Sequence, residues 1–133
     1  MYGSVGEYDK AKEHLEKALA INKEIGDRNG EADYYGNLGT VYGSVGEYDK
    51  AREHLEKSLA IKKQIGDRNG DAACYGNLGT VYSSVGEYDK ARELLEKSLA
   101  IKNQIGDRKG EAGCYENLGT VYLSVGEIGR AHV

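Results

Sequence analysis

The chain repeats itself at a fixed interval of 40 residues, which is marked by Gly6, Gly46, Gly86 and Gly126. The first three of these glycines begin the segments GEYDKAKEHLEKALAI, GEYDKAREHLEKSLAI and GEYDKARELLEKSLAI. A period of about 20 to 50 residues indicates a solenoid or a similar array, in which each unit buries its apolar faces against its neighbours. We therefore expect one array, a fragment of a longer one, with the register 1–40, 41–80, 81–120 and a truncated 121–133.

Each copy contains two series of apolar residues at helical spacing. In one copy they are Tyr75, Leu78, Tyr82 and Val85, followed by Tyr88, Ala91, Leu95, Leu99 and Ile101. Neither series alternates as a strand would. The second series and its counterparts predict one long helix, such as Tyr48 to Ile65. The 11 tyrosines fall mostly on these packing positions, so we expect them in the core.

Short turns separate the predicted helices. Gly46 stands in one turn and Gly66 with Asp67 in the other, where glycine supplies a left-handed helix stop and aspartate can cap the next helix. Turns this short force neighbouring helices to run antiparallel. The predicted fold class is all-α, an α-solenoid of antiparallel helical hairpins with six main helices. A further, returning helix is expected to begin at Glu127 and to stop after about two turns.

The glycine-rich segment GNLGTVYGSVG, from Gly36 to Gly46, could be a ligand loop or part of a helix. A loop that binds phosphate needs glycines in a turn between a strand and a helix, and no strand is predicted here. We therefore expect Gly36, Gly39 and Gly43 to lie along one flank of a helix. Gly39 in particular would let the next helix approach closely against Ala51.

The charge of the chain excludes some classes of partner. Charged residues make up 30% of the sequence, the net charge is −4 and the isoelectric point is near 5.4. Such a chain has no broad attraction for phosphate backbones or anionic lipids, so we expect neither nucleic acid nor membrane as a partner. No apolar run approaches the ~20 residues of a membrane span, and MYGSVGEYDK does not resemble a secretory signal. The expected location is cytoplasmic.

Two cysteines, Cys74 and Cys114, occupy the same place in successive copies. Stacked copies would hold their Cα atoms about 10 Å apart, beyond the ~7 Å limit for a disulfide, so we expect free thiols. Carboxylates such as Asp49, Glu53 and Glu56 repeat on solvated helix faces instead of converging in a pocket. We therefore expect no catalytic activity, no cofactor and no metal site.

A set of residues in one copy resembles a known repeat pattern: Tyr35, Leu38, Gly39, Tyr42, Gly46, Tyr48, Ala51, Leu55, Ser58 and Leu59. This order of an aromatic residue, Leu-Gly, Tyr, Gly, Tyr, Ala, a large apolar and a small residue resembles the tetratricopeptide repeat. The usual repeat has ~34 residues, so the KKQIGD segment and its equivalents would lengthen the helices. The phrase GDRxGEA...YxNLGxxY is similar to the long repeats of Pins-like G-protein-signalling scaffolds and, more distantly, of kinesin light chains.

The resemblance implies a right-handed superhelix whose first helices line a concave surface that holds an extended peptide. Family members often bind the peptide backbone through an asparagine, and the matching residues are Asn37, Asn77 and Asn117. An amide offers both a donor and an acceptor, so it suits a chain of any sequence. The same face is expected to carry Asp33, Ala73, Gly113, Glu116, Thr40, Thr80 and Thr120.

Other interpretations of these residues stay open. The asparagines could hydrogen-bond neighbouring helices or water, and near-identical copies could reflect recent duplication. Arg28, Arg68 and Arg108 lie near the starts of the first helices, where they could supply a cation to a ligand or stabilise the turns.

The two ends of the array predict self-association. Residues 8–25 lack the helix that should precede them, and residues 108–125 lack the one that should follow. Solenoids need capped ends to stay soluble, and these two faces are complementary. We therefore expect possible head-to-tail association, in which the last helix of one molecule packs on the first full helix of the next. The alternative function is thus a structural spacer or self-assembling segment.

Overall fold

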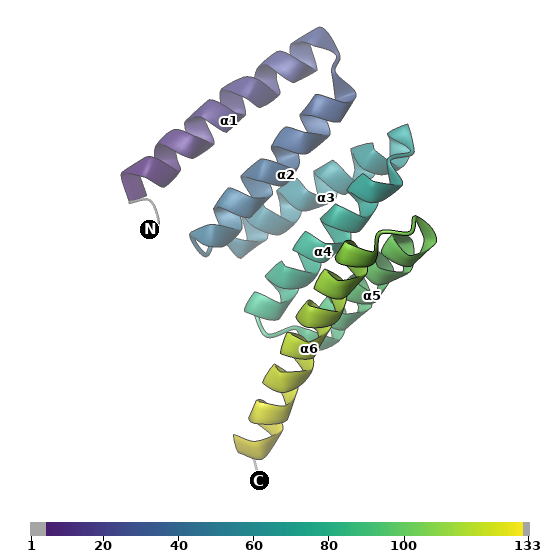
Figure 1. The fold of residues 1–133 in the computed structure, drawn as a ribbon. Coiled ribbons are helices and arrows are strands. Elements are labelled where there is room, and N and C mark those ends of the chain that lie inside the picture. Colours follow the sequence, from purple (N-terminus) through teal and green to yellow (C-terminus); the bar gives the residue numbers. More distant parts are fainter. Residues whose placement is uncertain (1–4, 132–133) are drawn as a thin grey trace. The chain divides into compact units, whose positions relative to one another are not determined.

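The computed structural model describes residues 5–131, and these residues are all-α. The chain divides into two compact units, Met1–Asp67 and Arg68–Val133. The first contains α1 (Val5–Ile25), α2 (Arg28–Ser44) and α3 (Tyr48–Ile65), and the second contains α4 (Arg68–Ser84), α5 (Tyr88–Gln104) and α6 (Arg108–Ala131), as Figure 1 shows. Successive helices within a unit pack as antiparallel pairs. The predicted fold class is confirmed, and α3 has the predicted bounds.

Glycines end the helices as the sequence predicts. Gly26, Gly66 and Gly106 have φ angles of 76°, 74° and 75°, and Gly46 and Gly86 have φ angles of 81°. After Gly26, the backbone N–H of Asp27 donates to the carbonyl oxygen of Asn22 at 2.9 Å, which satisfies a terminal carbonyl of α1. The Asp27 carboxylate then accepts from the N–H of Gly30 at 2.9 Å and caps α2. One short turn therefore ends one helix and begins the next.

The close approach of α2 and α3 depends on Gly39. A Cβ atom on Gly39 would lie 2.7 Å from Cγ of Leu55 and 3.2 Å from the carbonyl oxygen of Ala51. Leu55 is fully buried in this contact, and the Ser58 hydroxyl donates to the carbonyl oxygen of Ala32 at 2.8 Å. The predicted packing role of the glycine is confirmed, because a side chain there would push the two helices apart.

The second unit repeats this contact between α4 and α5. A Cβ atom on Gly79 would lie 2.9 Å from Cγ of Leu95 and 3.3 Å from the carbonyl oxygen of Ala91. Leu95 and Ala91 also belong to a buried apolar cluster that α6 completes with Leu118 and Val121. Both cysteines are buried free thiols, as predicted.

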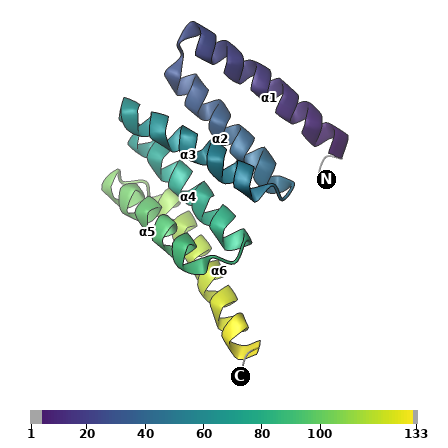
Figure 2. The same ribbon diagram turned by 180° about the vertical axis from the view of Figure 1, so that it is seen from behind.

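The expected returning helix after Gly126 is wrong. Figures 1 and 2 show α6 as one continuous helix, and it extends to Ala131. Gly126 has no positive φ, unlike Gly46 and Gly86. A turn at Gly126 would require residues 127–131 to form a separate helix that packs against α6. This segment has Ile128 and Gly129 where earlier copies have Tyr and Asp. Continuing the helix satisfies the backbone hydrogen bonds locally, so it replaces the turn. Residues 132 and 133 lie outside the described part.

Among the described residues, the prediction that tyrosines are core residues holds in full only at Tyr35 and Tyr42, and it fails on α6. Six other tyrosines are half-buried: Tyr8, Tyr34, Tyr48, Tyr75, Tyr82 and Tyr88. Tyr35 and Tyr42 of α2 are 7% and 8% exposed and lie beside the His54 ring of α3, at centroid distances of 6.0 and 5.0 Å. Their counterparts Tyr115 and Tyr122 are 62% and 54% exposed. No helix in the described residues covers this flank of α6, which explains the difference.

Candidate functional site

The predicted binding residues of the first unit form a stripe along α2. Asp33, Asn37 and Thr40 follow one another at spacings of four and three residues, which places them on one helix face. All three are exposed, whereas Leu38 and Gly39 face the core. Asn77 and Thr80 on α4, and Glu116, Asn117 and Thr120 on α6, are likewise exposed.

The threonines of this face use their hydroxyl groups within their own helices. Thr40 Oγ1 donates to the carbonyl oxygen of Gly36, Thr80 Oγ1 to that of Gly76 and Thr120 Oγ1 to that of Glu116, each at 3.2 Å. A hydroxyl in this state keeps lone pairs that can accept a hydrogen bond. These threonines can therefore receive an N–H group from a ligand.

The asparagines of the face differ from those in the turns. Asn29 and Asn69 accept hydrogen bonds from Lys62 and Lys102, each at 2.8 Å. By contrast, within residues 5–131 no protein group hydrogen-bonds the side-chain amides of Asn37, Asn77 and Asn117. Each of the three exposed amides therefore has a donor and an acceptor available for a ligand.

In the second unit, a hollow brings several of the predicted residues together. It has a volume of about 250 Å³ and is lined by Thr80, Asn117, Thr120, Gly79, Ser83, Ser84, Leu95 and Val121. Leu95 and Val121 are buried, and most of the other lining side chains are small and polar. Asn77 and Glu116 do not line this hollow. The arrangement offers a short apolar floor between polar walls.

Asp33 is part of an ion cluster that the sequence reading missed. Nζ of Lys62 lies 2.8 Å from Asp33, 3.0 Å from Asp67 and 2.8 Å from Asn29. Burial lowers the pKa of Lys62, but the hydrogen bonds with Asp33 and Asp67 together raise that pKa above its ordinary value. Asp33 is therefore paired with a buried cation that it shares with Asp67, and it is not an unpaired carboxylate on the α2 face.

The arginines near the helix starts stabilise the hairpins. Arg28 donates to Glu31 at 2.9 Å and to Gln64, at the end of α3, at 2.8 Å. Arg68 makes the equivalent bond with Gln104 at 2.7 Å. Of the two interpretations left open by the sequence, the geometry favours stabilisation of the turns.

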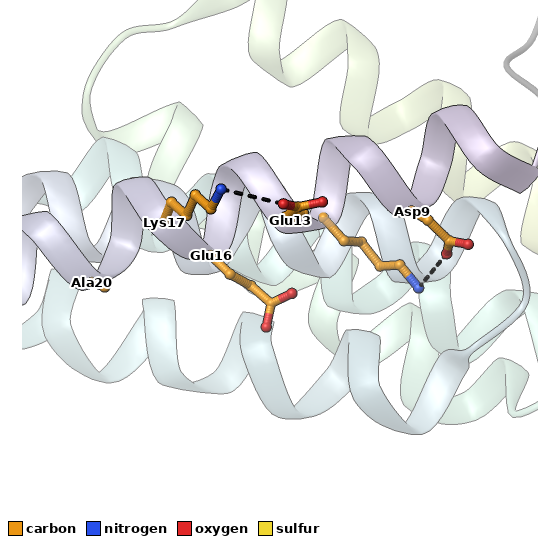
Figure 3. A pocket seen from close by; sticks show the side chains of 6 residues that line it. Asp9, Glu13, Glu16, Lys17 and Ala20 are labelled. Atoms are coloured by element: carbon orange, nitrogen blue, oxygen red, sulfur yellow. Dashed lines mark ion pairs between the residues drawn. The ribbon is translucent and has the colours of Figure 1, made fainter.

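A second hollow, of about 420 Å³, lies on α1 and is lined by Asp9, Lys12, Glu13, Glu16, Lys17 and Ala20 (Figure 3). Its charges pair along the helix: Lys12 lies 3.3 Å from Asp9, and Lys17 lies 3.2 Å from Glu13. Because one helix supplies every lining residue, the groups do not converge on a common point. This hollow provides no constellation for catalysis.

The described residues contain neither a candidate metal site nor a helix that could span a membrane. No group of three or more His, Cys, Asp or Glu side chains in residues 5–131 could hold a metal ion. None of the helices in that range combines the length and apolar character needed to cross a membrane.

Ser83 and Ser84 are the residues of the α4 and α6 hollow that sequence reasoning missed. Ser84 follows Thr80 by four residues, and its hydroxyl donates to the Thr80 carbonyl oxygen at 3.0 Å. That spacing, repeated at Ser44 and Ser124, was the available signal. From the sequence alone, serines at the end of a helix cannot be distinguished from other polar residues at helix ends. Only the position of the adjoining helix shows that they line a hollow.

A family model matches nearly the whole length of the chain. The model described as "Tetratricopeptide repeat" matches residues 1–64, 44–104 and 70–132. Among curated proteins, no sequence matches the chain.

Among solved structures, BtubC (BKLC) from P. vanneervenii is similar, with a TM-score of 0.80 and 27% identity over 96% of this chain. The chain spans about half of BtubC, 53% of its length. A putative kinesin light chain from Podosopora anserina with nearly identical TPR-like repeats has a TM-score of 0.76 and 23% identity, covering 95% of this chain and 63% of that one. A STAND protein from Pyrococcus horikoshii with a tetratricopeptide repeat sensor has a TM-score of 0.80 and 23% identity, covering 87% and 18%.

Proposed function

The chain belongs to the tetratricopeptide repeat family, and from that premise we propose that it is a non-enzymatic module that binds extended segments of other proteins. The proposed contact residues are Asn37, Asn77, Asn117, Thr40, Thr80, Thr120, Asp33 and Glu116. The observation that carries the proposal is the set of three exposed amides, on α2, α4 and α6, that no other group in residues 5–131 hydrogen-bonds.

The chemistry of this face favours recognition of peptide backbone. An asparagine amide can donate to a peptide carbonyl and accept from a peptide N–H, while the threonine hydroxyls accept. An extended segment presents both kinds of group in alternation, because its backbone has no internal partners. The hollow between α4 and α6, with Leu95 and Val121 on its floor, suits a small apolar side chain of such a segment.

The small number of charged residues on this face, Asp33 and Glu116, bears on the kind of peptide. The forty-residue period and the GDRNGEA phrase from Gly26 support a place near the Pins-like scaffolds within the family. Those scaffolds tend to carry arginine where this chain has Asp33, Ala73 and Gly113. Because Asp33 is already paired with Lys62, we expect weak binding of uncharged segments, led by the backbone.

Selection from a random peptide display library tests this proposal. We expect enriched peptides to bind the wild-type chain and to lose at least about tenfold in affinity on a triple variant with Asn37, Asn77 and Asn117 changed to alanine, since each lost hydrogen bond contributes about 1 kcal/mol. The matched control changes Asn29 and Asn69, whose amides serve the turns. No enriched peptide, or equal binding by the triple variant, would refute the proposal.

A second candidate function is a structural spacer or self-assembling segment. Large apolar residues at both ends of the described chain favour it: Ile21 and Ile25 on α1, and Tyr115, Tyr122 and Leu123 on α6, are exposed. This function predicts association that depends on protein concentration and needs no peptide. Sedimentation velocity from micromolar to millimolar protein measures it directly.

A further inference from the structure

The contact between α2 and α3 provides an internal template for a helix that packs on α6. In that contact Ala51 and Leu55 of α3 lie against Gly39, with no room for a Cβ atom. The contact between α4 and α5 repeats the geometry with Gly79. The same chain thus makes this contact twice, with the same residue types and distances within a few tenths of an ångström.

On α6 the corresponding glycine is uncovered. Gly119 aligns with Gly39 and Gly79, but a Cβ atom there would meet nothing within 4 Å. Tyr115 and Tyr122, which would flank the missing helix, are more than half exposed. The α6 flank is therefore an open copy of a surface that is covered twice elsewhere in the molecule.

The α1 helix carries the complementary surface. Residues 6–21 match residues 46–61 of the α3 segment except at Lys12 and Ala18, which replace Arg52 and Ser58. Ala11 and Leu15 align with Ala51 and Leu55, yet they are only half-buried, whereas Ala51 and Leu55 are fully buried. His14 is exposed, whereas its counterpart His54 lies between two tyrosine rings.

Two of the residues that differ between α6 and α2 lie on this surface and are compatible with the pairing. Glu116 and Leu123 replace Gly36 and Gly43. In the template, a Cβ atom on Gly36 is 3.5 Å from Oγ of Ser58, and one on Gly43 is 3.9 Å from Cβ of Ala51, so neither Cβ atom would clash. On α1 the residue that faces Glu116 is Ala18, which is smaller than Ser58, and the residue that faces Leu123 is Ala11, which is the same as Ala51.

We propose that α1 of a second copy of this chain packs on α6 in the register of α3 on α2, with the partner's Ala11 and Leu15 seated at Gly119. The inference rests on the second function proposed above and assigns its surface. The contact is heterologous, because the two copies contribute different helices, so association can continue beyond a dimer.

The decisive variant is Gly119→Leu. Among the described residues, a Cβ atom at Gly119 meets nothing within 4 Å in the free molecule, so the variant should fold with unchanged helical content. A leucine there would occupy the space required by the partner's Leu15, and we expect the association Kd to rise at least about tenfold. The control is Gly113→Leu on the same helix, at the position where Asp33 and Ala73 carry side chains without hindering α3 or α5.

Mixing variants tests the heterologous geometry. Ala11→Glu should block the α1 surface, with Ala20→Glu as control, because the aligned Ala60 and Ala100 are exposed in α3 and α5. A mixture of Ala11→Glu and Gly119→Leu chains leaves one intact α6 surface and one intact α1 surface. At a protein concentration at which each variant alone is monomeric, we expect the mixture to form heterodimers and nothing larger in sedimentation velocity.

Three outcomes would overturn the inference. A wild-type chain that stays monomeric to millimolar concentration removes the self-assembly function along with it. Association that Gly119→Leu leaves unchanged removes only this register. Larger assemblies in the mixture would show that α1 and α6 are not the paired surfaces. None of these results bears on peptide binding, which the asparagine variants measure separately.

Discussion

The α2 and α6 helices contain nearly the same sequence in different surroundings. Residues 35–46 read YGNLGTVYGSVG and residues 115–126 read YENLGTVYLSVG. In α2 the tyrosines are buried under α3 and the chain turns at Gly46, whereas in α6 they are exposed and the helix continues through Gly126. The residue pattern thus specifies a helix in both places, while the neighbouring helix decides which side chains are buried and where the helix ends.

The largest expected effect concerns two leucines in matching positions of α3 and α1. Leu55→Ala removes a fully buried side chain from the contact with Gly39 and should lower the free energy of unfolding by about 2 to 5 kcal/mol. Leu15→Ala removes a half-buried one and should lower it by less than about half as much. Urea unfolding at concentrations too low for association measures both. Equal losses would mean that the covering helix contributes little to burial.

Two glycine substitutions should differ in sign. Gly39→Ala places a Cβ atom 2.7 Å from Leu55 and should destabilise by about 1 to 2 kcal/mol, because overpacking outweighs the gain in helix propensity. Gly119→Ala meets no neighbour and should stabilise by about 0.5 to 1 kcal/mol. Thermal unfolding of both variants gives the comparison, and a stabilising Gly39→Ala would contradict the close approach of α3.

A smaller change in the free energy of unfolding is expected at a buried carboxylate position where the copies have different residues. Asp71 is buried and its Oδ1 atom has no hydrogen-bond partner among the described residues, whereas Glu31 and Glu111 at the same position bond Arg28 and Arg108. Asp71→Glu adds the missing methylene and should raise the free energy of unfolding by about 1 kcal/mol. Urea unfolding checks this gain. A loss would show that the longer side chain does not fit.

The smallest expected effect concerns the Lys62 cluster. Because hydrogen bonds with Asp33 and Asp67 leave the pKa of Lys62 above its ordinary value of 10.5, its contribution to stability is complete below that pH and falls as pH rises through the folded-state pKa. Asp33→Ala should destabilise by less than about 1 kcal/mol, since Asp33 is itself half-exposed.

In Asp33→Ala, the free energy of unfolding should also fall less between about pH 9 and about pH 11 than it does in the wild type. Urea unfolding at both pH values measures the change. An unaltered pH dependence in Asp33→Ala would mean that the ion pair does not hold the lysine proton.

The sequence alone predicted most of the fold, because each element depends on local signals. Helical spacing located α3 to the residue, and Gly66 with Asp67 located the turn after it. The wrong prediction at Gly126 relied on the Ser-Val-Gly signal that is correct at Gly46. What differed was the sequence that follows, which has Ile128 and Gly129 in place of Tyr48 and Asp49 and forms no separate helix. One copy of the repeat contains no information about its neighbour.

The candidate site was predictable in its residues but not in its chemical state. The asparagine positions followed from alignment of the copies. The pairing of Asp33 with Lys62 joins residues 29 positions apart at the end of α3, and no short motif announces it. The hollow around Thr80 and Asn117 also depends on the spacing of two helices.

The behaviour of Gly126 has a consequence for how such arrays can lengthen. The same Ser-Val-Gly sequence turns at Gly46 and Gly86 but remains helical at Gly126, so these three residues do not fix the bend by themselves and the residues that follow them decide it. Appending another forty residues should convert the final two turns of α6 from continuous helix into a turn that leads to the next helix. Each added unit would thereby change the conformation at the end of the unit before it. Lengthening the array would therefore alter the existing structure as well as extend it.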